Sequence, residues 1–201
     1  MSKKILKPRA AALSVALFAA FALYGGGVAA PAQEGGLKKG IVCMSVAFPE
    51  DLYDKAGDRT VVKFNPVLVK EIPPSREIGV FADFSYPGHN FAKPSALTLG
   101  FVHAALGETL NSDFSSNHGL TLTIGGEQIP LGDTSYNKKE ETTLRGKVQI
   151  ETMSLEVQSA VFTRIVNASS VGVKLGQTEF TLDEGQLNAL RKIAKRAQLI
   201  N

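Results

Sequence analysis

The sequence predicts a β-rich α+β fold, in which an antiparallel β-sheet or sandwich-like domain is followed by a C-terminal helix, β-hairpin and helix. Three observations lead to this prediction. Several segments alternate apolar and polar side chains with a period of two, two glycine turns place hairpin strands in matching apolar register, and helical periodicity gathers near the C-terminus. We therefore expect strands over about 41–151 and the helix-hairpin-helix element over about 154–198, within a single domain that spans 41–201.

The first 32 residues have the pattern of a cleavable secretory signal peptide. A basic stretch precedes the uncharged apolar segment 10–24, which is shorter than a bilayer-spanning helix. The small residues that end at Ala32 fit the cleavage pattern, so the mature chain would begin at Gln33 with a flexible lead-in over 33–40. A cut after Ala30 and an uncleaved membrane anchor are the alternatives. We expect an exported protein, either periplasmic or secreted.

Most of the positive charge belongs to this leader. The whole chain has 22 basic and 19 acidic side chains, a formal net charge of +3, but four of the basic residues and none of the acidic ones lie in the first 32 residues. The mature chain therefore carries 18 basic and 19 acidic side chains, a net charge of −1. This balance argues against nucleic acid as a partner, and we expect no transmembrane segment in the mature chain.

The first part of the mature chain predicts one buried strand and one edge strand. Residues Ile41–Phe48 are apolar on both faces, which is typical of a strand inside a core, and Cys43 is expected to be a buried thiol. The polar segment Pro49–Asp58 is expected to form a loop. Thr60–Lys70 is strand-like but contains Pro66, which favours an edge or bulged position.

Three further segments alternate with a period of two and predict antiparallel strands with one face on a core: Ile78–Tyr86, Ala96–His103 and Thr143–Glu151. In the third segment, Leu144 is expected on the apolar side and Glu151 on the polar side. Two hairpins can also be read in register. The turn at Gly125-Gly126 pairs Leu122 with Ile129 and Leu120 with Leu131, and the turn at Gly176-Gln177 pairs Val173 with Phe180 and Val171 with Leu182.

Helical signals are confined to the last 50 residues or so. Ser154–Asn167 has helical spacing of apolar side chains, and it is expected to be the first helix. Thr181 and Glu184 have the spacing of a capping box that would begin a second helix ending near Gln198. The apolar face of this second helix is expected to contain Leu187, Leu190, Ile193, Ala194 and Ala197.

No catalytic, metal-binding or cofactor-binding motif is present in the sequence. His89, His103 and His118 are separated by 14 and 15 residues, unlike the closely spaced ligand pairs of tight zinc sites. The G-x-S-x-G nucleophile elbow is missing, and the apolar setting of Cys43 does not favour a thiolate nucleophile. We therefore assign no catalytic residue, no metal ligand and no cofactor.

The sequence favours a non-catalytic binding or envelope-associated interaction module, whose partner is a protein or a small ligand in the cell envelope or the extracellular space. Phe84, Tyr86, His89 and Phe91 surround a Pro-Gly turn and are the expected contact residues. One alternative is a histidine-dependent hydrolase or metal-binding enzyme, which requires an imidazole close to another imidazole or to a carboxylate in a pocket. The other is a carrier of small apolar ligands, which requires an internal cavity of roughly 300 Å³ or more.

Overall fold

The computed structural model describes residues 41–43, 49–107 and 113–201. The predicted signal peptide, the cleavage site after Ala32 and the lead-in over 33–40 lie outside the described residues. So does most of the buried strand expected at Ile41–Phe48, whose described part, 41–43, is not a strand. The side chain of Cys43 is nevertheless buried, as expected.

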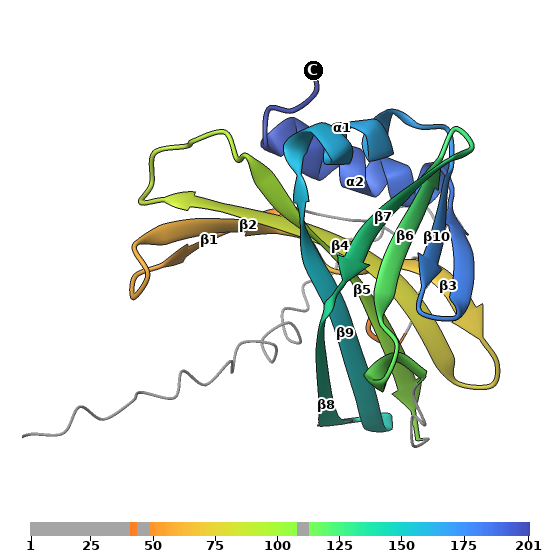
Figure 1. Ribbon diagram of the computed structural model, residues 1–201. Helices are drawn as coiled ribbons and strands as arrows, with labels where there is room; N and C mark the ends of the chain where they lie inside the picture. Colours follow the sequence, from red (N-terminus) through yellow and green to blue (C-terminus); the bar gives the residue numbers. More distant parts are fainter. Residues whose placement is uncertain (1–40, 44–48, 108–112) are drawn as a thin grey trace, which may run out of the picture. The chain divides into compact units, whose positions relative to one another are not determined.

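The described chain forms two antiparallel β-sheets and two α-helices, so the strand-rich antiparallel fold predicted from the sequence is confirmed (Figure 1). In chain order the elements are β1 (Glu50–Asp54), β2 (Arg59–Lys63), β3 (Val67–Ile72), β4 (Arg76–Pro87), β5 (Ala96–Leu106), the short 3₁₀ helix η1 (Asp113–Ser115), β6 (Gly119–Ile124), β7 (Glu127–Asp133), β8 (Ser135–Thr143), β9 (Gly146–Gln158), α1 (Ser159–Asn167), β10 (Val171–Leu175), β11 (Thr178–Leu182) and α2 (Glu184–Arg196).

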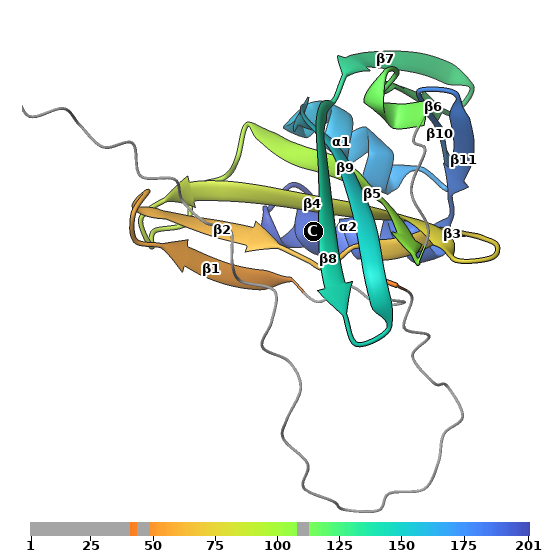
Figure 2. The ribbon, with the colours of Figure 1, turned by 90° about the horizontal axis from the view of Figure 1, so that it is seen from below.

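The larger sheet has seven strands in the order β1-β2-β4-β5-β9-β8, with β3 also paired to β4, and the smaller sheet has the order β11-β10-β6-β7. β2 and β3 pair with opposite ends of β4, because Pro66 interrupts the run between them (Figure 2). The single strand expected at Thr60–Lys70 is therefore two strands. The loop expected at Pro49–Asp58 is wrong, since β1 pairs with β2 in a hairpin.

One face of the larger sheet packs into the main core. Apolar side chains from β4, β5 and β9 meet those of β6, β10 and both helices there, and Phe101 and Phe162 are fully buried among them. α1 contacts β5 and β9, whereas α2 contacts β3 and β4. The strands expected around Ile78–Tyr86 and Ala96–His103 are confirmed as β4 and β5. Leu144 does not face the core as expected, because it is exposed in the turn between β8 and β9.

The hairpin at Gly125-Gly126 forms at the expected turn, where both glycines have positive φ. Leu122 pairs with Ile129 as predicted. A bulge next to Leu120 shifts the register beyond that pair, so Leu120 lies opposite Gly132 and not opposite Leu131. The predicted register was thus correct only near the turn.

In the C-terminal segment, the β10–β11 hairpin pairs Val173 with Phe180 and Val171 with Leu182. The first helix starts later than expected: α1 begins at Ser159, and 154–158 continues β9 as a strand paired with β5. Period-two pairing with a long neighbouring strand outweighs the weak helical spacing of these five residues.

The N-cap of α2 is Asp183, and the capping box expected from Thr181 and Glu184 is wrong. The carboxylate of Asp183 accepts a hydrogen bond from the backbone N–H of Gly185 at 2.9 Å. The backbone N–H of Asp183 in turn donates to the side chain of Gln186 at 3.0 Å. Thr181 cannot cap the helix because it belongs to β11. The five apolar residues expected on the inner face of the helix are all buried.

Arg191 of α2 joins the two helices. Its guanidinium donates to the backbone carbonyl oxygens of Val166 at 2.7 Å and Ala168 at 3.1 Å, at the C-terminal end of α1. The same group donates to the side chains of Glu184 and Asn188 on its own helix. A planar group with several N–H donors thereby satisfies carbonyl groups that the end of α1 leaves without helical partners.

We predict that Arg191→Met lowers the free energy of unfolding by about 1–3 kcal/mol, because carbonyl groups at the helix end lose their donors. Lys195→Met, an exposed position on the same helix, is the matched control and should change stability by less than about 0.5 kcal/mol. Urea denaturation of both variants measures the difference. Equal stability of the two variants would show that the Arg191 contacts contribute nothing.

Candidate functional site

The second face of the larger sheet, which we call the back face, carries a row of polar side chains across five strands. In the strand register, Glu50 lies opposite Lys63, Lys63 opposite Asp83, Asp83 opposite Thr98, and Thr98 opposite Glu156. Directly opposed residues of antiparallel strands point to the same face. These five side chains, which we call the polar row, therefore lie side by side on the back face.

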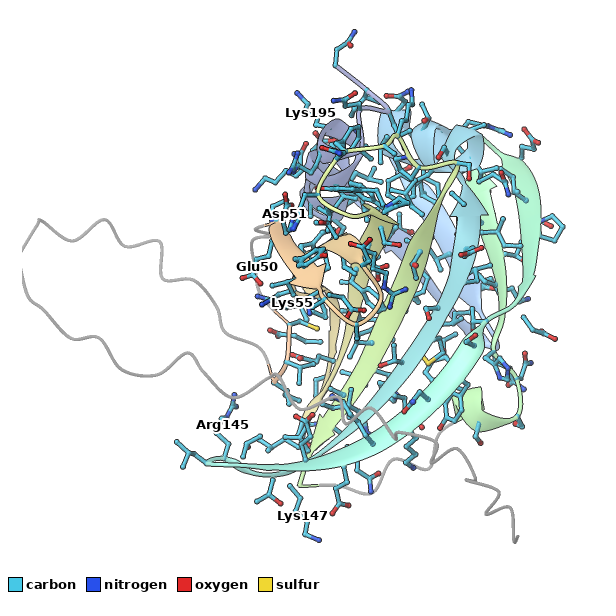
Figure 3. All side chains as sticks on the ribbon, turned by 90° about the vertical axis from the view of Figure 1, so that its left-hand side faces the viewer. Glu50, Asp51, Lys55, Arg145, Lys147 and Lys195 are labelled. Atoms are coloured by element: carbon cyan, nitrogen blue, oxygen red, sulfur yellow. The ribbon has the colours of Figure 1, made fainter. Side chains whose placement is uncertain are left out.

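Figure 3 views the edge of the sheet at β1, where this row begins. Glu50 belongs to the row, whereas its neighbour Asp51 points to the other face and pairs with Arg196 of α2. The labelled Arg145 and Lys147 mark the distant tip of the β8–β9 hairpin, well away from the row. The charged side chains of the β1 edge and those of the hairpin tip are thus separate features.

A groove opens where β4 and β5 part. Their pairing ends at Asp83 and Thr98, but β4 continues to Pro87 alongside β2, while the start of β5 pairs with β9. The space between them has a volume of about 360 Å³. Its polar lining includes Asp83, Ser85, Lys93, Ser95, Thr98 and Glu156. Asp83, Thr98 and Glu156, the last three residues of the polar row, therefore line an open groove.

Asp83 is a partly buried carboxyl group in this groove. Burial raises its pKa above the ordinary value of 3.8, whereas the hydrogen bond from Thr98 and the positive charge of Lys63 act in the opposite direction. Burial is the largest of the three effects. The negative charge of Asp83 is therefore only partly compensated by its neighbours.

We predict that Asp83→Asn changes the pH dependence of stability. Because the folded pKa is raised, the folded state binds more protons than the unfolded state between pH 3.8 and that raised pKa. Wild-type stability should therefore fall relative to Asp83→Asn as the pH rises through this window, and the difference should level off above it. Urea denaturation at a series of pH values measures it. A difference that is independent of pH would contradict this account of Asp83.

A second groove, of about 380 Å³, lies beside the Gly125-Gly126 turn and the end of α1. It is lined by Thr123, Ser169, Thr181 and neighbouring small residues, and none of its lining residues carries a charge. The groove at Asp83 has more groups that can bind a polar ligand than this second groove, because hydroxyl, carboxylate and ammonium groups line it.

The four residues expected to contact a partner lie in different environments. Phe84 and Tyr86 are buried in the main core, and their rings pack edge to face against Phe91. His89 is exposed and stacks on Tyr53, with ring centroids 3.9 Å apart. Phe84 and Tyr86 also line the groove at Asp83, whereas His89 and Phe91 do not. A contact role for the four residues stays a prediction.

Sequence reasoning missed most of the groove. The alternation of β4 did place Asp83 and Ser85 on the side away from the core. Thr98 lies in a strand that was predicted, but nothing singled it out, and Glu156 was assigned to a helix. No local signal could have joined these side chains, because the polar row depends on pairing between segments that are far apart in the chain.

A buried polar cluster lies on the core side of the sheet. Nδ1 of His103 is 3.0 Å from Oε2 of Glu151, and the hydroxyl of Tyr136 donates to Oε1 of Glu151 at 2.7 Å. The ring of His118 stacks on Tyr136, and its Nδ1 contacts the backbone carbonyl oxygen of Phe114 at 3.0 Å. The sequence placed Glu151 on the polar side of its strand, but its side chain is fully buried.

This cluster meets one requirement of the enzyme alternative, an imidazole next to a carboxylate. The carboxylate of Glu151 is already bound on both oxygens, and neither of the two grooves is lined by a histidine. Its role in the described structure is to join β5, β8 and β9 through buried hydrogen bonds.

We predict that Glu151→Gln lowers the free energy of unfolding by about 1–3 kcal/mol, because it weakens the hydrogen bonds that satisfy His103 and Tyr136 in the interior. Glu140→Gln, an exposed glutamate on β8, is the control and should change stability by less than about 0.5 kcal/mol. Thermal or urea unfolding measures both. If the two substitutions have equal effects, the cluster does not stabilise the fold.

The described residues provide neither a reactive thiolate nor a metal-binding cluster. Burial and the nearby carboxylate of Glu77 raise the pKa of the Cys43 thiol well above its ordinary value, which disfavours the thiolate. Within the described residues, no group of three or more His, Cys, Asp or Glu side chains is placed to bind a metal ion. None of the described helices combines the length and apolarity needed to cross a bilayer.

Comparison with known proteins adds no assignment: no family model, curated protein or solved structure is significantly similar to this chain.

Proposed function

We propose that this protein is an exported, non-catalytic binding module that takes its ligand in the back-face groove between β4 and β5. The observation that carries the proposal is the convergence of Asp83, Thr98 and Glu156 on an open groove of about 360 Å³. A few fixed charged and hydroxyl groups that converge on a concave surface can orient a ligand and make its binding specific. Long paired strands hold these groups, so little ordering is needed on binding.

The main core supports this proposal as a rigid scaffold. α1, the β10–β11 hairpin and α2 follow one another in the C-terminal segment, and their apolar faces belong to the main core. The buried rings of Phe84 and Tyr86 join this core to the lining of the groove. A loop or groove on a rigid scaffold is where binding residues are commonly found.

Export is the second part of the proposal, and it rests on the leader sequence alone. The basic stretch, the apolar segment 10–24 and the small residues that end at Ala32 support secretion with Gln33 as the mature N-terminus. The partner would then be a protein or small ligand of the periplasm, the cell envelope or the extracellular space.

Both alternatives have weaker support. A histidine-dependent hydrolase would use His103 with Glu151, a pair that is buried and also bound by Tyr136. A carrier of small apolar ligands would need an apolar internal cavity, whereas the grooves described here are open to solvent and lined mainly by polar groups. Phe101 and Phe162 fill the centre of the core.

Blocking the groove tests the binding function. Ser85 is an exposed groove residue, so we predict that Ser85→Arg preserves the fold but abolishes the thermal stabilisation that bound ligands give. Ser116→Arg makes the same change at an exposed loop position and is the control. A small-molecule library is screened by thermal shift against residues 33–201 of all three proteins. If ligands stabilise Ser85→Arg as well as the control, the groove is not the binding site.

A further inference from the structure

The charges of the polar row alternate over its first three residues and then stop alternating. Glu50, Lys63 and Asp83 read negative, positive, negative, and each is the register partner of the next. The next two residues are the neutral Thr98 and the negative Glu156. Opposite charges on neighbouring strands stabilise a sheet, and in the register Lys63 stands between the two carboxylates. No cation of the row lies between Asp83 and Glu156.

The spacing of the strands suits a cation at this point. Neighbouring strands are about 4.8 Å apart, so the backbones at Asp83 and Glu156 are roughly 10 Å apart with Thr98 between them. Thr98 is short, and the groove lies over it. A positive group above Thr98 could therefore approach both carboxylates, in the same way that Lys63, two strands away on β2, stands between Glu50 and Asp83 in the register.

We propose that the groove binds an organic cation with a primary ammonium or guanidinium end, which lies above Thr98 between Asp83 and Glu156. This inference rests on the proposed binding function. The hydroxyl of Thr98 donates to Asp83, which leaves its oxygen able to accept an N–H of the ligand. Charge-assisted hydrogen bonds to the two carboxylates would orient the cationic group.

The remaining charges around the groove agree with a single bound cation. Lys93 lines the groove at an exposed position, and Lys63 lies beside Asp83. Together with Glu50, Asp83 and Glu156, these side chains carry one net negative charge, which one monovalent cation would neutralise. Among the described residues, no group of three or more His, Cys, Asp or Glu side chains is placed to bind a metal ion. Two carboxylates on strands roughly 10 Å apart, with a hydroxyl between them, suit an organic cation with several N–H donors.

The first test places a positive charge between Asp83 and Glu156 by substituting Thr98. We expect Thr98→Lys to place its ammonium between Asp83 and Glu156, to raise the melting temperature by a few degrees and to abolish cation binding. Thr98→Met is the matched control, since it has similar length and no charge, and it should not raise the melting temperature. A Thr98→Lys variant that is no more stable than Thr98→Met would overturn the proposal.

The second test measures binding by NMR titration of residues 33–201. n-Butylammonium and ethylguanidinium should shift the amide signals of the groove saturably, whereas n-butanol and butyrate should not. Asp83→Asn and Glu156→Gln should each weaken cation binding at least fivefold. Equal binding of butanol or butyrate would overturn the cation specificity but leave the groove as a binding site. If no probe binds while ligands from the thermal-shift screen do, only this inference fails.

Discussion

The carboxylate of Glu77 fixes the segment that enters the fold. Its two oxygens accept hydrogen bonds from three successive backbone N–H groups, those of Ile41 at 2.7 Å, Val42 at 2.5 Å and Cys43 at 2.8 Å. Glu77 is almost fully buried at the start of β4, so an unsatisfied charge there would be very costly. Gly79 completes the fit, because a side chain at that position would collide with the sulfur of Cys43.

This contact divides the back face into two halves with different chemistry. In one half, Ile41 and Val42 pack on the small apolar cluster formed by β5 and β9. In the other half, the polar row continues into the open groove beside β4. The opposite face of the same strands packs into the main core. Among the described residues, the long strands β4, β5 and β9 thus contribute to three surfaces: the main core, the small apolar cluster and the open groove.

How much of this arrangement can be predicted from the sequence depends on how far apart along the chain the interacting residues lie. β4, β5 and the turn-proximal part of the first hairpin could be predicted, because alternation and turn residues are local signals. β1 and β8 were missed because their side chains are mostly exposed and do not alternate. Glu151 was placed on the polar side of its strand, and Glu77 was not singled out, because their partners lie 15–48 and 34–36 residues away. The polar row likewise requires the strand order, which the sequence does not specify.

The central claim, that Glu77 holds the entering segment on the back face, can be tested through Cys43, the only cysteine of the chain. Under native conditions, an aromatic disulfide reagent should label Cys43 at least a hundredfold more slowly than it labels the urea-unfolded protein. Glu77→Gln should raise the native labelling rate at least tenfold, because the three N–H groups lose their charged acceptor. A Glu77→Gln variant that is labelled as slowly as the wild-type protein would contradict the account.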